Sequence, residues 1–247
     1  MKIFTGAQIH ELDQYTIEHE PIKSIDLMER AAKAITHAIT EEWSDTTPIV
    51  VFAGSGNNGG DALAVARLLI AEGYKVKVVL FNISNHLSED CTTNKNRLLQ
   101  TKHFNDFTEV KVSFDPPELT ADTLVIDGLF GTGLKKSLAG GFASLVKYIN
   151  QSPSKVVSID MPSGLLAEDN SCNVRANIIQ ADLTLTLHQK KLAFLLGESQ
   201  QFLGRVKVLD IRLSEEFIEK TNAHYLTLDE ADVRKKLLPR NDFAHKG

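Results

Sequence analysis

Three short segments of the sequence place acidic, amide or hydroxyl side chains beside glycines, a combination that can hold a ligand and act on it. They read GSGNNGGD from Gly54, DGLFGTGLKKS from Asp127 and DMPSG from Asp160. A carboxyl group can donate and accept a proton, or bind a hard cation through its oxygens. A single aspartate after a strand is most often only a turn or helix cap, but three such segments together favour a functional site.

The first segment matches the spacing of a dinucleotide-binding turn, because Gly54, Gly56 and Gly59 fit G-x-G-x-x-G. A nicotinamide-binding unit usually carries an acid about twenty residues further on, for the ribose hydroxyls. Asn82 stands at that position here. Asp61 is expected at the start of the following helix, where the helix dipole stabilises a carboxylate that would compete with a phosphate. Both residues argue against a hydride-transferring dehydrogenase, which stays the enzyme alternative.

The second segment is the better phosphate candidate. Gly131 and Gly133 let the backbone turn its N–H groups toward an anion, and Lys135, Lys136 and Ser137 add donors. A glycine turn with solvated lysines is the alternative interpretation of the same residues.

Apolar runs and helical patterns alternate from residue 48 onward. Strands are expected at 49–53, 75–81, 124–126, 156–159, 183–187 and 206–209, with helices at 61–73, 88–101 and 141–150. This rhythm predicts an α/β fold, a Rossmann-like three-layer αβα sandwich with a mostly parallel central sheet. Ligands of such sheets bind beyond the carboxyl ends of the strands, where all three segments would meet.

Two helices are expected before this sheet. Thr5 and Gln8 form a plausible capping box for the first, and the second begins near Ser24. The apolar residues of the second helix form one narrow stripe, namely Ile25, Met28, Ala32, Ile35 and Ile39. The stripe can pack on the main domain, or it can form a contact between two copies in a homodimer.

Composition narrows the functional classes. The chain has 247 residues and a net charge of -5, which gives no electrostatic reason to expect nucleic acid as a partner. It has no apolar run of membrane-spanning length and no signal-peptide core, so we expect no membrane partner and a cytoplasmic location. Cys91 and Cys172 are far apart in sequence and are expected to be free thiols.

Five segments in consistent order resemble the YjeF N-terminal domain, the family of NAD(P)H-hydrate epimerases. They read LMERAA (27–32), AGSGNNGGDALAVARLL (53–69), VIDGLFGTGL (125–134), VVSIDMPSGL (156–165) and ADLTLTLHQKKLAF (181–194). Two positions depart from the family pattern, which commonly has alanine where Gly128 stands and glycine where Ala62 stands.

The resemblance implies an isomerase that interconverts the R and S forms of hydrated NADH or NADPH, a repair reaction on a damaged dinucleotide. Asp160 would be its acid and base, either for loss and return of water or for a reversible opening of the ring. The substrate would be contacted by Asn57, Asn58, Gly59, Gly60, Asp61, Gly131, Thr132, Gly133, Leu134, Lys135, Lys136, Ser137 and Asp160. Asn58, Asp127 and Ser163 would bind a potassium ion (K+), and their oxygens are of the type that hard cations prefer. A non-catalytic binding scaffold is the alternative from another class.

The end of the sequence resembles the opening of a second domain. LPRNDFAHKG (238–247) is similar to the start of an ADP-dependent NAD(P)H-hydrate dehydratase domain. The expected organisation is therefore an epimerase domain over 1–227, followed by 228–247 as a linker to, or the start of, a dehydratase domain in a longer bifunctional chain. Among the remaining residues, His188 is expected in a strand as a half-exposed sheet residue, and the acid-rich segment 215–232 as a solvated helix surface.

Overall fold

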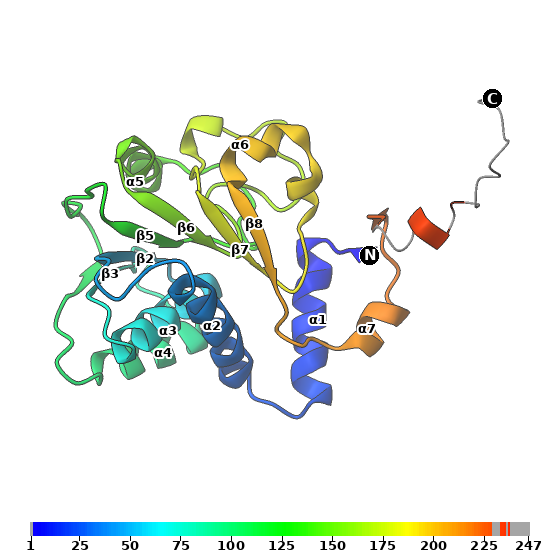
Figure 1. The fold of residues 1–247 in the computed structure, drawn as a ribbon, viewed down its shortest axis with the longest axis horizontal. Helices are drawn as coiled ribbons and strands as arrows, with labels where there is room; N and C mark the ends of the chain where they lie inside the picture. The colour runs from blue at the N-terminus through cyan, green and yellow to red at the C-terminus, as the bar shows by residue number, and fades with distance from the viewer. Residues whose placement is uncertain (1, 229–232, 236, 238–247) are drawn as a thin grey trace, which may run out of the picture.

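A seven-stranded sheet forms the centre of the computed structural model, which describes residues 2–228, 233–235 and 237 (Figure 1). Its order is β4-β3-β2-β5-β6-β7-β8, and every neighbouring pair is parallel. The strands are β2 (Ile49–Ala53), β3 (Val76–Phe81), β4 (Phe107–Val110), β5 (Leu124–Gly128), β6 (Lys155–Ile159), β7 (Leu183–Leu187) and β8 (Arg205–Leu209). The predicted parallel sheet is confirmed, and β4 is a strand that the sequence pattern did not predict.

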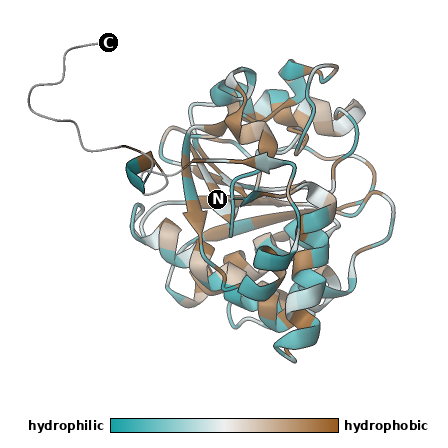
Figure 2. Cartoon of the chain, turned by 90° about the vertical axis from the view of Figure 1, so that its right-hand side faces the viewer, coloured by the Kyte–Doolittle hydropathy of each residue, from teal (hydrophilic) through white to brown (hydrophobic). Residues whose placement is uncertain are grey.

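Helices cover both faces of this sheet and complete the predicted three layers (Figure 1). One face carries α2 (Ser24–Thr40), α3 (Asn57–Ala71) and α4 (Glu89–Leu99), and the other carries α5 (Gly140–Gln151) and α6 (Gln200–Leu203). The central strands are buried on both faces, as their unbroken apolar runs require (Figure 2). Three short 3₁₀ helices occupy Arg175–Asn177, Leu192–Leu195 and Gly197–Ser199.

The two N-terminal helices form as predicted. The side chain of Thr5 accepts a hydrogen bond from the backbone of Gln8, and the Gln8 side chain accepts one from the backbone of Thr5, which completes the capping box of α1 (Gly6–His19). On α2 the side chains from Met28 to Ile39 along the apolar stripe are buried, while Ile25 is half-buried. Packing on the chain's own core therefore accounts for most of the stripe, and the homodimer stays a prediction.

Residues close to both ends of the described chain meet beside α1. Strand β1 (Lys2–Ile3) pairs antiparallel with β9 (Tyr225–Leu226). Between them, α7 (Glu215–Lys220) presents exposed acidic side chains, as expected for the first part of the acid-rich segment, whereas residues 229–232 lie outside the described residues. The segment 238–247 also lies outside them, so the predicted boundary at 227 stays a prediction. Of the helices described, none is long and apolar enough to cross a membrane.

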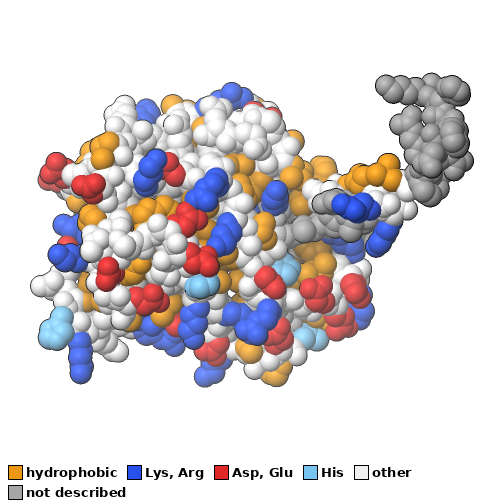
Figure 3. All heavy atoms as spheres, in the orientation of Figure 1, with side chains coloured by type: hydrophobic (Ala, Val, Ile, Leu, Met, Phe, Trp, Pro, Cys, Tyr) orange, Lys and Arg blue, Asp and Glu red, His pale blue; other side chains and the backbone are white. Residues whose placement is uncertain are grey.

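Both cysteines are free, in agreement with the sequence-based expectation: Cys91 is buried and Cys172 is exposed. Lys and Arg side chains are interspersed with Asp and Glu side chains over the face shown in Figure 3. This mixture accords with the small net charge of -5.

Candidate functional site

The three segments singled out in the sequence lie at one edge of the sheet. Strands β2, β5 and β6 are parallel neighbours, so their carboxyl ends meet there. Chain connections run in opposite directions from β2 and β5, which makes this pair the switch point at which ligands of doubly wound sheets bind. A cavity of about 960 Å³ opens at this place. Its walls come from α1, α2, the first turns of α3 and the loops that follow β5, β6 and β7.

Most of the predicted contact residues line this cavity: Asn57, Asn58, Asp61, Gly131, Thr132, Gly133, Leu134, Lys135, Lys136 and Asp160. Gly59, Gly60, Ser137, Asp127 and Ser163 are not in its lining. Ser137 instead donates a hydrogen bond to Asn173 Oδ1 at 2.7 Å and accepts one from the Val174 amide. The loop that carries the two lysines is thereby fixed to the segment after β6.

Two glycines of the first segment serve close packing. A Cβ atom on Gly54 would lie 1.9 Å from the Leu129 carbonyl oxygen, and one on Gly59 would lie 1.8 Å from the Gly54 carbonyl oxygen. Neither backbone carbonyl can move away cheaply, so these positions require glycine. The G-x-G-x-x-G match thus describes how α3 approaches the strands, and it does not by itself define a phosphate site.

Asp61 differs from the sequence prediction. Helix α3 begins at Asn57, four residues earlier than expected, so Asp61 lies beyond its first turn and is 9% exposed. Burial raises the pKa of its carboxyl well above the usual value, and the nearby Asp160 and Asp13 raise it further. The prediction that the helix dipole stabilises an Asp61 carboxylate is therefore wrong. The free N–H groups of α3 belong to the turn at Gly56 and Asn57, which lines the cavity.

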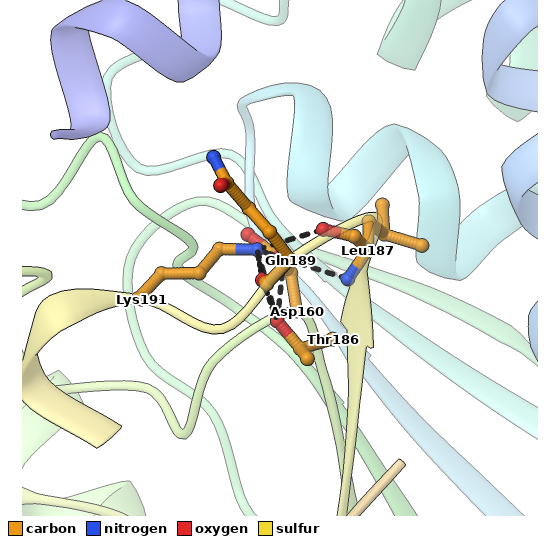
Figure 4. Close-up of polar contacts among 5 residues, drawn as sticks. All are labelled: Asp160, Thr186, Leu187, Gln189 and Lys191. Carbon is orange, nitrogen blue, oxygen red and sulfur yellow. Dashed lines mark hydrogen bonds and ion pairs between the residues drawn. The ribbon is translucent and has the colours of Figure 1, made fainter. Parts of the chain in front are cut away.

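Asp160 lies directly after β6 with its carboxyl at the cavity wall (Figure 4). Its Oδ1 forms an ion pair with Lys191 and accepts hydrogen bonds from the Leu187 amide at 3.2 Å and the Thr186 hydroxyl at 3.4 Å. The residue adopts a φ of +62°, which is rare for any residue other than glycine. Such strain is tolerated where the surrounding structure enforces it, often at active sites.

Lys191 is the buried cation of the site, with only 1% of its surface exposed. Besides the ion pair, its Nζ donates to the Thr186 hydroxyl at 2.9 Å and to the carbonyls of Leu187 at 3.1 Å and Gln189 at 3.2 Å (Figure 4). A buried ammonium is costly unless paired and hydrogen-bonded, and here it is both. Lys191 therefore fixes the position of the Asp160 carboxyl.

The ends of β6 and β7 share one type of turn. After β6 the Met161 amide donates to the Ile159 carbonyl at 2.7 Å, and after β7 the Gln189 amide donates to the Leu187 carbonyl at 2.7 Å. The middle residue has a positive φ in both turns, +62° at Asp160 and +61° at His188. His188 thus follows the strand instead of lying in it, and its side chain is 14% exposed. Burial lowers its pKa, so its imidazole is neutral at pH 7.

Asp127 and Ser163 lie next to the cavity, in a pocket of polar groups that is closed to solvent. The Asp127 carboxyl accepts four hydrogen bonds, from Ser163 Oγ at 2.5 Å, the Ser163 amide at 2.8 Å, Ser158 Oγ at 2.8 Å and the Leu129 amide at 3.3 Å. Burial raises its pKa, and these hydrogen bonds oppose that shift.

Asn58 lines the cavity and lies beside Gly131, in the loop that follows β5. Its amide carbon and oxygen lie 3.3 Å from the position of a Cβ on Gly131, and its Nδ2 is buried without a hydrogen-bond partner in the part of the chain that the structure describes. The amide oxygen and nitrogen are assigned by their contacts, so either atom can take the buried position. The carbonyl of Phe130, 3.3 Å from Ser163 Oγ, adds another oxygen. The donor set is chemically suited to a hard monovalent cation.

Asp13, Gln189 and Lys191 belong to the cavity wall but were not among the predicted site residues. Lys191 belongs to the segment 181–194 that resembles the family, and it follows the strand expected at 183–187. Its place just after a strand was the signal that could have identified it. Asp13 carried no such signal, because it stands on a helix whose pattern looks purely structural.

The sheet order, the cavity at its switch point and the aspartate–lysine pair define a doubly wound α/β protein with a polar site for a small-molecule ligand. The family model described as "YjeF-related protein N-terminus" matches residues 24–193. The chain belongs to this family.

Similar proteins match most of the chain. The chain is 36% identical over 206 residues to the NAD(P)H-hydrate epimerase of Limosilactobacillus fermentum, covering 83% of this chain and 95% of that protein. It is 34% identical to that of Oenococcus oeni, covering 85% of this chain and 97% of that protein. A crystal structure of a yeast protein superposes with a TM-score of 0.71 at 19% identity, covering 94% of this chain and 98% of that chain, and so supports the fold.

A longer relative shows a different organisation. The bifunctional NAD(P)H-hydrate repair enzyme of Moorella thermoacetica is 31% identical over 257 residues, which cover 100% of this chain and 47% of that enzyme. This chain therefore spans about half the length of that relative.

Proposed function

We infer that this chain is an NAD(P)H-hydrate epimerase, an isomerase that acts in the repair of hydrated NADH and NADPH. Relatives with that name are 34% to 36% identical and are matched over nearly their full lengths. The observation that carries the inference in this chain is the Asp160–Lys191 pair at the wall of the cavity, beside the loops that follow β2 and β5.

We propose an acid/base route at the ring carbon that bears the hydroxyl. A carboxyl protonates the hydroxyl, which leaves as water, and the adjacent ring nitrogen stabilises the resulting cation. Water then adds to the opposite face of that carbon and gives up a proton, which restores the hydrate with inverted configuration. Asp160 is the group proposed to carry these protons, since its carboxyl reaches the cavity while Lys191 and the Leu187 amide hold it in place.

The remaining cavity residues are proposed to bind the dinucleotide. Backbone N–H groups at Gly56 and Asn57 begin a helix, and Lys135 and Lys136 bring positive charge to the same cavity. Together they offer anion sites to the substrate's phosphates. Gly59 and Gly60 allow the close packing of the first turns of α3, and Ser137 holds the loop of Lys135 and Lys136 through its hydrogen bond to Asn173. We therefore propose that these three predicted contact residues act indirectly.

We propose that Asn58, Asp127 and Ser163 hold a potassium ion. Their support is the donor set: a carboxylate, a hydroxyl and an amide beside the Phe130 carbonyl, with one buried amide nitrogen left unpaired among the described residues. A bound cation would supply fixed positive charge near the substrate's phosphates. Activity in potassium chloride should exceed that in an equal concentration of a large tetraalkylammonium chloride. Ser163→Ala should reduce this difference, and equal activity in both salts would remove the ion from the proposal.

The function is tested by incubating the purified chain with R or S hydrate and separating the two forms chromatographically. We expect interconversion above the spontaneous rate. A rate equal to the spontaneous one would instead support a binding scaffold, while an absorbance change in the nicotinamide band with an alcohol substrate would support a dehydrogenase. Three further statements stay predictions. Cell fractionation tests the cytoplasmic location, and the mass in solution tests the homodimer. The reading frame of the parent gene tests whether a dehydratase domain follows.

A further inference from the structure

Asp13 lies on the cavity-facing side of α1, outside the residues matched by the family model. Its side chain is half-buried and forms no hydrogen bond with any residue that the structure describes. Its neighbours on the buried face of the same helix, Leu12 and Thr16, pack against the rest of the chain. The helix is therefore fixed in place while it presents an unpaired carboxyl to the cavity.

The cavity holds more carboxyl groups than its buried cation can balance. Asp13, Asp61 and Asp160 share it, and Lys191 is paired with Asp160. Like charges at close range cannot all ionise at neutral pH. Burial and the charge of Asp160 raise the pKa of Asp13 to about 7, with Lys191 acting in the opposite direction. At neutral pH Asp13 is thus able to give and to take a proton.

We propose that Asp13 is a second catalytic carboxyl, which exchanges a proton with the substrate from the α1 side of the cavity while Asp160 does so from the sheet side. This proposal rests on the proposed epimerase function. Inversion at one carbon requires departure of water from one face and addition of water to the other. Two carboxyls carried by two different elements match that requirement better than one.

The protons balance over a full cycle. In one direction Asp13 gives its proton to the departing hydroxyl, the carbon–oxygen bond breaks, and Asp160 takes a proton from the water that adds. Asp13 is then ionised and Asp160 protonated, so the site is set for the reverse direction. Exchange through water in the cavity returns it to the starting state. No oxidant or reductant is consumed.

Asp61 is a poorer candidate for this role. It is 9% exposed, and its pKa is raised well above the usual value by burial and by the like charges of Asp160, Asp13 and Asp90. A carboxyl that holds its proton so firmly can donate a hydrogen bond to the ligand, but it does not readily release and recover the proton. Asp13 is more exposed than Asp61, and its pKa of about 7 leaves its protonated and ionised forms in comparable amounts at neutral pH.

The test compares the chain with Asp13→Asn and with Glu11→Gln, which removes an exposed carboxyl from the same helix. We expect Asp13→Asn to lower kcat/KM about 10²–10³-fold, and Glu11→Gln to leave it unchanged. Since the acid must be protonated, kcat/KM of the wild-type chain should fall as pH rises through about 7. That alkaline fall should be absent in Asp13→Asn. The other titratable groups of the cavity wall are His10 on the same helix, and Asp160, Asp61, His188, Lys191, Lys135 and Lys136 on the other walls.

A second measurement needs no substrate. A carboxyl with a raised pKa binds more protons in the folded chain, so the contribution of Asp13 to stability falls as pH rises from 3.8 toward about 7. Urea unfolding should therefore show Asp13→Asn gaining stability relative to wild type as pH rises from about 4 to about 7. An Asp13→Asn chain with the wild-type rate and pH profile would overturn the role of Asp13 alone. A folded wild-type chain without epimerase activity would overturn the proposed function together with it.

Discussion

Two aspartates at the ends of neighbouring strands of the sheet are used in opposite ways. Asp127 is the penultimate residue of β5, has no exposed surface and accepts four hydrogen bonds from neutral donors. Asp160 comes directly after β6, reaches the cavity and is paired with a buried cation. The same local pattern, an aspartate at the end of a buried strand, thus yields a sealed polar cluster in one case and a group open to substrate in the other.

The difference arises from the backbone and the partners on the carboxyl-terminal side of each aspartate. After Asp127 the chain continues through Gly128 into the loop of the second segment, and Ser163 approaches from the next strand's loop to close the cluster. At Asp160 a turn with positive φ redirects the side chain to the cavity, where Lys191 meets it. The comparison predicts that changes at Asp160 act on catalysis, and that changes at Asp127 act on stability and ion binding.

Asp160→Asn should have the largest effect. The amide cannot carry a proton, so epimerisation should fall by about 10²–10⁴-fold. Lys191 keeps its acceptors on Thr186, Leu187 and Gln189, so the domain should remain folded with reduced stability. Asp45→Asn, at an exposed position, is the matched control. Rates and far-ultraviolet circular dichroism check both parts, and near-wild-type activity would exclude Asp160 from the mechanism.

Asp127→Asn should instead act mainly on stability. Its amide nitrogen would face O–H or N–H donors that now point at a carboxylate, leaving buried donors unsatisfied. The free energy of unfolding should fall by about 3 kcal/mol, measured by urea denaturation. A variant with wild-type stability but no activity would show that Asp127, like Asp160, acts on catalysis, and would contradict the proposed difference between the two aspartates.

Lys191→Met should lower kcat by about 10–100-fold, with a smaller effect on KM. The carboxyl of Asp160 would keep the Leu187 amide and the Thr186 hydroxyl but lose its cation, and with it its fixed position. The neighbouring Lys190 is exposed, so Lys190→Met is a matched control. Lys191→Arg, which retains the charge, should recover part of the activity. If the methionine variant has wild-type kcat, Lys191 does not position Asp160.

The sheet and the meeting of the three segments were predictable, because long apolar strands and the rule for parallel sheets depend on local pattern. Three features could not be predicted: strand β4, the pairing of β1 with β9, and the unpaired carboxyl of Asp13 in the cavity. Short strands and tertiary contacts leave no periodic signal in the sequence. The start of α3 was misplaced because Asn57–Gly60 have low helix propensity, which packing overrides. The positive φ of Asp160 likewise depends on its tertiary hydrogen bonds.

The smallest predicted effect concerns the two departures from the family pattern, which lie in direct contact next to Asp127. A Cβ on Gly128 would lie 2.3 Å from the Cβ of Ala62, so each position limits the other. The family's alanine and glycine have exchanged places here, which conserves one methyl group at this contact. Gly128→Ala alone should destabilise the fold through this clash, by about 1–3 kcal/mol.

Adding Ala62→Gly should recover most of that loss, although glycine in a helix costs about 1 kcal/mol. The double-mutant cycle should therefore give a favourable coupling of about 1–2 kcal/mol in the free energy of unfolding. Additive effects of the two substitutions would mean that β5 can shift away from α3. In that case the closed packing around Asp127 would be less rigid than its four hydrogen bonds imply.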